Sequence, residues 1–421
     1  MPRIRIRIVA VVTIAVIFVL SGIPQMSLAE EIPHPFAVAV KSAVLIDANS
    51  GQILYGQNPD ERIMPASFVK LLTLFLIFDA IDQGQVLLED KVWISKKAWR
   101  TGGSKMFVRQ ANRVPLEELI KGIAVVSGND ACIAVAEFLQ GNEEAFVAKM
   151  NQKVQELGLE NTQFQTVNGW PAPDQYTTAL DMALLARAYV QAYPEALQYH
   201  KLKEFTHEDI RQRNRNALLW RDPSVDGLKT GHTEESGYHL LATAKREDQR
   251  FIAVVMGAKS EALREREALR LLNYGFRNFV SVELFKKGDA LLQVSVWKGT
   301  ESQVELEASE DGVITVPLAQ QADVTYQAKT PERLFAPIDT GQTIGQVVIV
   351  AKDKVLKNVS LVADREVPLA GFLKRTFHSA ALLSIDHGMS LIFSVVVLLA
   401  MAGLVFYLRR RKPRRSRGTR H

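Results

Sequence analysis

Two β-hairpin patterns that enclose a long helical segment constrain the fold of this chain more than any other sequence feature. The first pattern, SAVLIDANSGQILY, occupies residues 42–55, and the second consists of YHLLATAK (238–245) and RFIAVVMGA (250–258). Apolar residues recur at helical spacing between them, most clearly over 115–123 and 178–192. Strands at both ends with helices between them predict an α+β domain whose first and last strands share one antiparallel sheet.

The sequence pattern changes after about Ser281. Short alternating runs such as ALLQVSVW and QVVIVAKDKVLKNVSLV follow one another, separated by Gly, Asp and Pro, without a long helical pattern. We therefore predict a first domain over residues 36–280 and a small all-β domain over residues 281–367. A linker, 368–390, follows; within it GFLKRTFHSAALLSI (371–385) is either a short amphipathic helix at a membrane surface or a plain connection.

The N-terminal residues 1–29 have the order of a secretory signal peptide. Three arginines precede an apolar stretch, and Ser27-Leu28-Ala29 offers a small-residue cleavage site. The alternative is an uncleaved membrane anchor, although the apolar stretch is short for a span of about 20 residues.

The C-terminal residues 391–408 carry no charged side chain and are followed by the basic tail 409–421. This pattern predicts a C-terminal transmembrane helix. Because basic flanks stay on the cytoplasmic side, both domains are expected on the extracytoplasmic (periplasmic) side of the cell membrane, held by a single span.

The formal net charge of +5 does not indicate nucleic-acid binding. Three arginines lie in the leader and eight lysines or arginines follow Leu408, with no acidic residue in either segment. The rest of the chain is therefore acidic overall, and no nucleic-acid partner is expected.

Cys132 is the single cysteine of the chain, so no intramolecular disulfide can form. An exported domain of this size must then be stabilised by burial alone. Cys132 lies in ACIAVAEFL, where apolar residues recur at helical spacing, and we expect a buried, unreactive thiol.

Ser67 and Lys70, in PASFVKLLT, are candidates for a nucleophile and its base. Pro65 suits the first turn of a helix, and the apolar residues after Lys70 would bury that helix, with both side chains on one face. Burial favours a neutral amine that can take the hydroxyl proton. The same spacing in Ser295 and Lys298 falls in an alternating run, where residues three apart point to opposite faces of a strand.

Two further short motifs strengthen this hypothesis. Ser127-Gly128-Asn129 lies between two helical runs, and Lys229-Thr230-Gly231 enters a strand-like stretch. Taken singly, such motifs are usually a helix cap and a turn. In this order with Ser-x-x-Lys they form the signature of β-lactamases and penicillin-binding proteins, with Gly128 at a position where that signature has Asp.

The chain resembles the serine-type D-alanyl-D-alanine carboxypeptidases, the low-molecular-mass penicillin-binding proteins of bacterial cell-wall metabolism. The stretches KAWRTGGSKMF, VSGNDACIAVAE, PAPDQYTTALDMALLAR and RDPSVDGLKTGHT carry the resemblance, which runs from about Phe36 to Phe276 and more loosely over the β domain. It implies a serine β-lactamase/transpeptidase-like α+β domain. The implied substrates are the D-Ala-D-Ala ends of peptidoglycan stem peptides, and β-lactams would bind at the same site.

The resemblance also implies a role for each motif residue. Ser67 would be the acylated nucleophile, Lys70 its base, and Ser127 the relay of the leaving-group proton. The implied substrate-binding residues are Asn129, Lys229, Thr230, Gly231, His232 and Arg264.

Some of these implied roles are more specific. Asn129 would bond the substrate backbone, Lys229 would keep Lys70 neutral, and Thr230 would bond the terminal carboxylate. The backbone amides of Ser67 and His232 would form the oxyanion hole. Arg264 would assist with the carboxylate, with Arg266 as the alternative.

The expected reaction is hydrolysis of the terminal D-Ala-D-Ala bond through a Ser67 acyl-enzyme. No metal or organic cofactor is expected, since the eight histidines show no ligand spacing such as His-Glu-x-x-His. Three alternatives stay open: a D-Ala-D-Ala endopeptidase, a β-lactamase and a non-catalytic wall-binding protein. The stretch PAPDQYTT speaks against a β-lactamase, because it offers no Glu to activate the deacylating water.

Overall fold

The computed structural model of the chain describes residues 32–352, 354–379, 381–382 and 396–403, which form two compact units. The first unit contains most of the chain up to Leu271. The second contains the chain from Leu272 onward together with the tips of two hairpins, Asp47–Gln52 and Ala244–Phe251.

A five-stranded sheet forms the centre of the first unit. Backbone N–H groups of Lys41 and Ala48 donate to the carbonyl oxygens of Met256 and Arg250 at 3.0 and 2.8 Å, so the first strand runs antiparallel to the last. This confirms the predicted sharing of one sheet by the two hairpins. In spatial order the strands are β2 (Ile53–Gln57), β1 (Ser42–Asp47), β9 (Gln249–Ala258), β8 (Gly237–Arg246) and β7 (Val225–Thr233).

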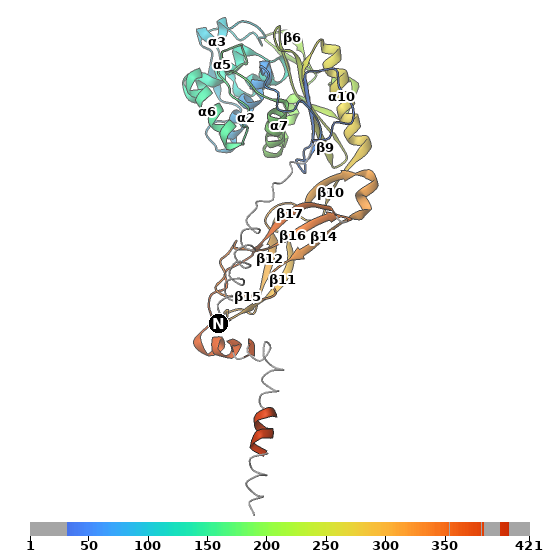
Figure 1. The fold of residues 1–421 in the computed structure, drawn as a ribbon. Helices are drawn as coiled ribbons and strands as arrows, with labels where there is room; N and C mark the ends of the chain where they lie inside the picture. The colour runs from blue at the N-terminus through green and yellow to red at the C-terminus, as the bar shows by residue number, and fades with distance from the viewer. Residues whose placement is uncertain (1–31, 353, 380, 383–395, 404–421) are drawn as a thin grey trace, which may run out of the picture. The chain divides into compact units, whose positions relative to one another are not determined.

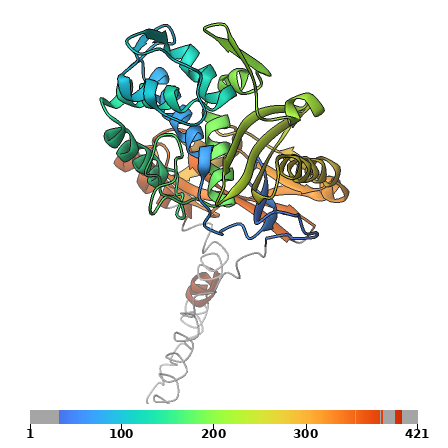
Figure 2. The ribbon, with the colours of Figure 1, turned by 90° about the horizontal axis from the view of Figure 1, so that it is seen from above.

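Helices cover both faces of this sheet, as the two views in Figures 1 and 2 show, with α10 on one side and the other long helices on the opposite side. Helix α2 is predominantly apolar and eleven of its residues, Lys70 among them, are buried, which is typical of a central core helix. The long helices are α2 (Val69–Asp82), α4 (Leu116–Val126), α5 (Asn129–Gln140), α6 (Glu143–Glu156), α7 (Ala179–Ala192) and α10 (Glu261–Asn278).

Short elements connect the long helices and strands of this unit. They are η1 (Ala66–Phe68), β3 (Lys91–Trp93), α3 (Lys96–Arg100), β4 (Arg113–Pro115), η2 (Pro194–Ala196), α8 (Leu197–His200), β5 (Glu204–His207), β6 (Ile210–Arg213) and α9 (Leu218–Arg221).

The second unit is built from strands, which confirms the predicted all-β domain. Alternate residues such as Val304, Leu306, Val347 and Ile349 are fully buried in its core. A six-stranded sheet has the order β14 (Val324–Lys329), β16 (Thr343–Ala351), β17 (Lys354–Ala363), β12 (Gln303–Ala308), β11 (Ala290–Trp297) and β15 (Leu334–Phe335), and a separate pair joins β10 (Phe279–Glu283) to β13 (Val313–Pro317), which leads into η3 (Leu318–Asp323).

Both terminal predictions fall largely outside the described residues. The predicted signal peptide, 1–29, lies wholly outside them, and of the predicted span, 391–408, only 396–403 is described, as a helix. Residues 372–379 and 381–382 are also helical. No helix in the described part of the chain combines the length and apolar character needed to cross a membrane.

Candidate active site

Ser67 and Lys70 meet where a short 3₁₀ turn runs into a buried helix. Ser67 lies in η1 and Lys70 in the first turn of α2. Lys70 Nζ donates a hydrogen bond to Ser67 Oγ at 2.9 Å and another to the carbonyl oxygen of Asn168. The Lys70 side chain is fully buried, while Ser67 is half-buried. The amine is therefore positioned to exchange a proton with the hydroxyl.

Close packing from two directions fixes the backbone that carries Ser67. The preceding residue, Ala66, has a φ of +47°, a conformation that L-residues rarely adopt. Gly169 lies so close that a Cβ atom there would sit 1.8 Å from the Ala66 carbonyl oxygen. A Cβ at Gly231 of strand β7 would be 3.3 Å from Ala66 Cβ. The surrounding chain thus imposes this strained backbone and with it the direction of Ser67.

The second and third motifs, far apart in sequence, meet through one hydrogen bond. Ser127 ends helix α4 with a φ of +60°, and Asn129 begins helix α5. Lys229 Nζ donates to Ser127 Oγ at 3.0 Å and to the Thr230 carbonyl oxygen at 3.0 Å. Both Ser127 and Lys229 are buried to 2% exposure. Two hydroxyl–amine pairs, Ser67–Lys70 and Ser127–Lys229, therefore lie in this unit.

A polar cavity of about 380 Å³ opens at Ser67. It contains the predicted residues Thr230, Gly231, His232 and Arg264. The His232 ring is exposed and stacks on Tyr238, with ring centroids 4.0 Å apart. The complete lining comprises Ser67, Ser104, Arg215, Thr230, Gly231, His232, Tyr238, Glu261 and Arg264.

The structure distinguishes Arg264 from its predicted alternative, Arg266. Arg264 lines the cavity and its side chain is only 3% exposed. The Arg266 side chain is 67% exposed and pairs with Glu267 at 2.7 Å. Of the two arginines, Arg264 therefore shares a cavity with Ser67.

Burial changes the proton affinity of both lysines. It lowers the pKa of Lys70 to about 8; of the neighbouring groups Cys132 opposes this shift, Arg215 lowers the pKa further and Asp130 raises it. Burial also lowers the pKa of Lys229 well below its ordinary value, and the charges of Lys70 and Arg215 add to that shift. Roughly a tenth of Lys70 is thus neutral at pH 7, and this neutral form can act as a general base.

Cys132 is fully buried in helix α5, which confirms the predicted burial. Burial raises the pKa of its thiol to about 12, so the reactive thiolate is not formed near neutral pH. Ser295 lies in strand β11, with Lys298 just beyond the strand, as the alternating pattern predicted.

Sequence reasoning missed a loop that is fixed next to Asn129. The buried Asp130 carboxylate accepts hydrogen bonds from the N–H groups of Met106, Phe107 and Val108 at 2.9–3.2 Å. Asn129 N–H donates to the Ser104 carbonyl at 2.7 Å, and its Nδ2 donates to the Gly102 carbonyl at 2.9 Å. Asp130, the acidic residue directly after Ser-Gly-Asn, was the sequence signal that could have indicated this fixed loop.

Arg215 is the second residue that sequence reasoning missed. Its Nη1 donates to Ser104 Oγ at 2.7 Å, at the edge of the cavity. It belongs to RQRNRNALLW, a basic stretch without a recognisable motif, so no local pattern distinguishes it from its neighbours.

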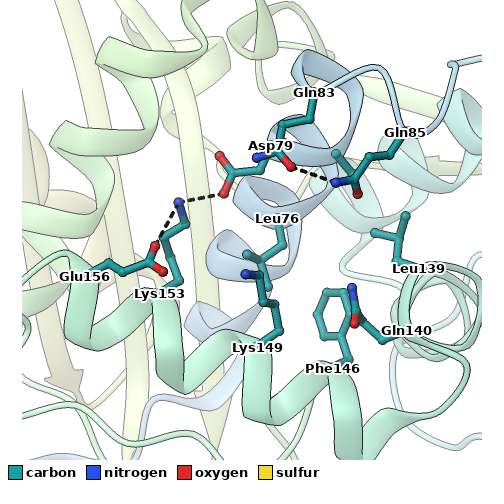
Figure 3. A pocket seen from close by; sticks show the side chains of 11 residues that line it. Leu76, Asp79, Gln83, Gln85, Leu139, Gln140, Phe146, Lys149, Lys153 and Glu156 are labelled. Atoms are coloured by element: carbon teal, nitrogen blue, oxygen red, sulfur yellow. Dashed lines mark hydrogen bonds and ion pairs between the residues drawn. The ribbon is translucent and has the colours of Figure 1, made fainter.

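A different pocket lies at the opposite end of α2, between α2, α5 and α6 (Figure 3). Three of its charged side chains pair: Lys153 lies 2.7 Å from Asp79 and 3.5 Å from Glu156. Lys149 Nζ donates to Gln152 Oε1 at 3.3 Å. Gln85 Nε2 donates to Gln83 Oε1 at 2.8 Å. This pocket contains none of the predicted site residues, so the cavity at Ser67 is the stronger candidate for chemistry.

Comparisons with known proteins agree with this geometry. Residues 29–260 match the family model described as D-alanyl-D-alanine carboxypeptidase, and residues 279–369 match the C-terminal domain of penicillin-binding protein 5. The D-alanyl-D-alanine carboxypeptidases DacC and DacA of Escherichia coli (strain K12) are 39% and 40% identical over 84% and 81% of this chain, and over 90% and 87% of their own lengths. Penicillin-binding protein 5 from Haemophilus influenzae has a TM-score of 0.76 and 38% identity, covering 80% of this chain and 99% of its own.

Proposed function

This chain belongs to the D-alanyl-D-alanine carboxypeptidase family, and we propose that it releases the terminal D-alanine of peptidoglycan stem peptides through an acyl-enzyme on Ser67. The observation that carries the proposal is the 2.9 Å hydrogen bond between Ser67 Oγ and the fully buried Lys70 amine. Such a pair activates a hydroxyl without a histidine.

In the acylation step, neutral Lys70 accepts the Ser67 proton as Oγ attacks the carbonyl carbon of the penultimate D-alanine. The backbone amides of Ser67 and His232 stabilise the resulting oxyanion. The close approach of Gly231 to Ala66 supports this assignment, because it brings the two backbone segments together.

The leaving D-alanine takes its proton from Ser127, which is hydrogen-bonded to Lys229 and can recover a proton there. Water then attacks the acyl carbon, the ester C–O bond breaks and Ser67 Oγ takes back the proton held by Lys70, while the proton that water loses restores the Ser127–Lys229 pair. The shortened peptide is then released. Each step uses groups of the protein itself, with no metal or organic cofactor.

Substrate binding is assigned to strand β7 and to the motif Ser127-Gly128-Asn129, which is hydrogen-bonded to β7 through Lys229. Asn129 bonds the peptide backbone, while Thr230 and Arg264 bind the terminal carboxylate. Arg264 is almost buried beside the cavity, which supports its role as a fixed cation.

The test of this proposal is incubation of the protein with a D-Ala-D-Ala pentapeptide and, separately, with fluorescent penicillin. We expect stoichiometric D-alanine release, and mass spectrometry should map the penicilloyl group to Ser67. Absence of both reactions would favour a non-catalytic wall-binding protein. Rapid penicillin turnover would favour a β-lactamase, and cleavage of cross-linked dimers in preference to pentapeptide would favour an endopeptidase.

The acylation rate should rise with pH toward a plateau. Lys70 acts as a base only when neutral, and its pKa of about 8 leaves roughly a tenth of it neutral at pH 7. The second-order rate of penicillin acylation should therefore increase about tenfold per pH unit below pH 8 and level off above it. A rate that is constant between about pH 6 and pH 9 would contradict the assignment of Lys70 as base.

We further propose that residues 1–29 are a signal peptide, that residues 36–280 and 281–367 are separate domains on the extracytoplasmic side, and that residues 391–408 anchor the protein in the cell membrane. The uncharged stretch before the basic tail supports this arrangement. In the linker, the exposed apolar residues Phe372, Leu373 and Phe377 would suit an amphipathic helix at the membrane surface.

Truncation before the apolar segment, at Gly388, should release a soluble enzyme with full activity, since no motif residue lies beyond Arg266. The measurement is fractionation of cells that express the full and truncated chains, with penicillin labelling of each fraction. A truncated protein that remains in the membrane fraction would identify residues 371–385 as a second anchor, and loss of labelling would show that the C-terminal segment supports the catalytic domain.

A further inference from the structure

We infer that Arg215 is a second residue that binds the terminal carboxylate of the substrate, and that Arg264 serves in part to hold Arg215 in position. The inference rests on the proposed function and concerns how the enzyme selects a chain end.

Arg264 is already engaged within the protein. Its Nη2 donates to the backbone carbonyl of Arg215 at 3.2 Å and to Glu261 Oε1 at 3.4 Å. The guanidinium carbon lies 5.6 Å from the ring centroid of Tyr238. Glu261 therefore offsets part of the Arg264 charge. The Nη2 group of Arg264 also holds the backbone of Arg215 in place.

Arg215 is an exposed residue that lines the same cavity, and although the hydrogen bond of Glu261 is to Arg264, the Glu261 charge also acts on Arg215. The hydrogen-bond partner that the structure gives its side chain is the neutral hydroxyl of Ser104, 2.7 Å from Nη1. A hydroxyl carries no charge to offset the cation, whereas a carboxylate does and can accept two parallel N–H bonds from one guanidinium. A substrate carboxylate in the cavity would therefore replace Ser104 as the preferred partner.

The segments on both sides of this contact are fixed. Ser104 belongs to the loop that is bonded to Asn129 and Asp130. Next to Arg215, Asn216 Nδ2 donates to the Gly227 carbonyl at 2.9 Å, and Asn214 Nδ2 donates to the Leu202 carbonyl at 2.9 Å. Only the Arg215 side chain must then reorient, because Arg264 of helix α10 bonds its backbone carbonyl and the next residue, Asn216, is bonded to Gly227 of strand β7.

The experiment must separate two effects of the Arg215 charge: direct binding of the carboxylate and the shift of the Lys70 pKa. Glu261 acts on Arg215 and Arg264 alike, and the Arg215 charge also lowers the pKa of Lys70. Removing Arg215 would thus slow reaction with every substrate near pH 7. Above about pH 9.5 Lys70 is neutral in all variants, so its titration no longer contributes. The Arg215 charge also lowers the pKa of Lys229, but that effect is common to both substrates, so the difference between them reports direct carboxylate binding.

The experiment compares a peptide that ends in D-Ala-D-Ala with the same peptide carrying a C-terminal carboxamide, using the full chain at about pH 9.5. In Arg215→Gln, kcat/KM for the free acid should fall about 10- to 100-fold, mainly through KM, while the carboxamide should change less than about threefold. Arg215→Lys should recover part of the loss, since the charge remains. Arg213→Gln is the matched control: Arg213 is exposed, lies over Trp220 and does not line the cavity.

Two further variants test the division of roles. Arg264→Ala should also lower the preference for the free acid, and the double variant Arg215→Gln with Arg264→Ala should lose less than the two single losses combined, because Arg264 both binds the carboxylate and holds Arg215. Ser104→Ala should retain the preference, since it removes only the resting partner. Thermal melts check that all variants fold, which matters most for Arg264→Ala because the Arg264 side chain is only 3% exposed.

Equal losses on acid and carboxamide in Arg215→Gln would overturn the inference, as would full additivity in the double variant. Either result would leave the proposed function intact, provided that penicillin still acylates Ser67 of the unmodified protein. If that acylation fails, the proposed function itself is wrong.

Discussion

Ser67→Ala is expected to abolish covalent labelling by penicillin and to lower D-alanine release by about 10⁴-fold or more. In the proposed mechanism this hydroxyl oxygen forms the acyl bond, and it is the hydroxyl to which Lys70 is hydrogen-bonded. Its one side-chain hydrogen bond is to Lys70, and Ser67 is only half-buried, so the fold should persist. Fluorescent-penicillin labelling, D-alanine release and a thermal melt measure these effects.

Ser295→Ala provides the control for this variant. Ser295 has the same Ser-x-x-Lys spacing but lies exposed in strand β11 of the second unit. It should retain full labelling. Labelling that persists in Ser67→Ala, or that maps to Ser295, would refute the assignment of the nucleophile.

Lys70→Arg is expected to lower acylation by about 10³-fold although it conserves the positive charge. A guanidinium stays protonated at every accessible pH and cannot accept the Ser67 proton. The buried site lowers the pKa of Lys70 to about 8, and no comparable shift could make arginine neutral near pH 7. The measurement is the second-order rate of penicillin acylation between about pH 7 and pH 9.5. In Lys70→Arg this rate should no longer show the pH dependence expected of the unmodified enzyme.

Because Lys70 is fully buried, the larger arginine could also disturb the fold. Lys70→Met removes the charge with a similar length, so it should fold and be equally inactive. Lys298→Arg, the matched change in the second Ser-x-x-Lys, should be silent. Substantial activity in a folded Lys70→Arg or Lys70→Met protein would exclude Lys70 as the base.

The features that sequence predicted well are those that depend on neighbouring residues. Ser67 and Lys70 are one helical turn apart, so their contact follows from helix geometry once the apolar run is recognised as helix α2. The hairpins, the antiparallel sheet and the all-β second domain likewise follow from apolar periodicity and turn residues. The motif Ser-Gly-Asn was correctly expected between two helices, because Ser127 ends α4 and Asn129 begins α5.

Tertiary packing decided what periodicity could not. Arg264 and Arg266 are two residues apart and project from different sides of α10, and only the packing of that helix brings Arg264 to the cavity. The Lys229–Ser127 bond joins residues 102 positions apart, and the Arg215–Ser104 bond joins residues 111 positions apart. Local sequence carries the residue types for such contacts but not their distances, since these depend on how the sheet, the helices and the loops pack together.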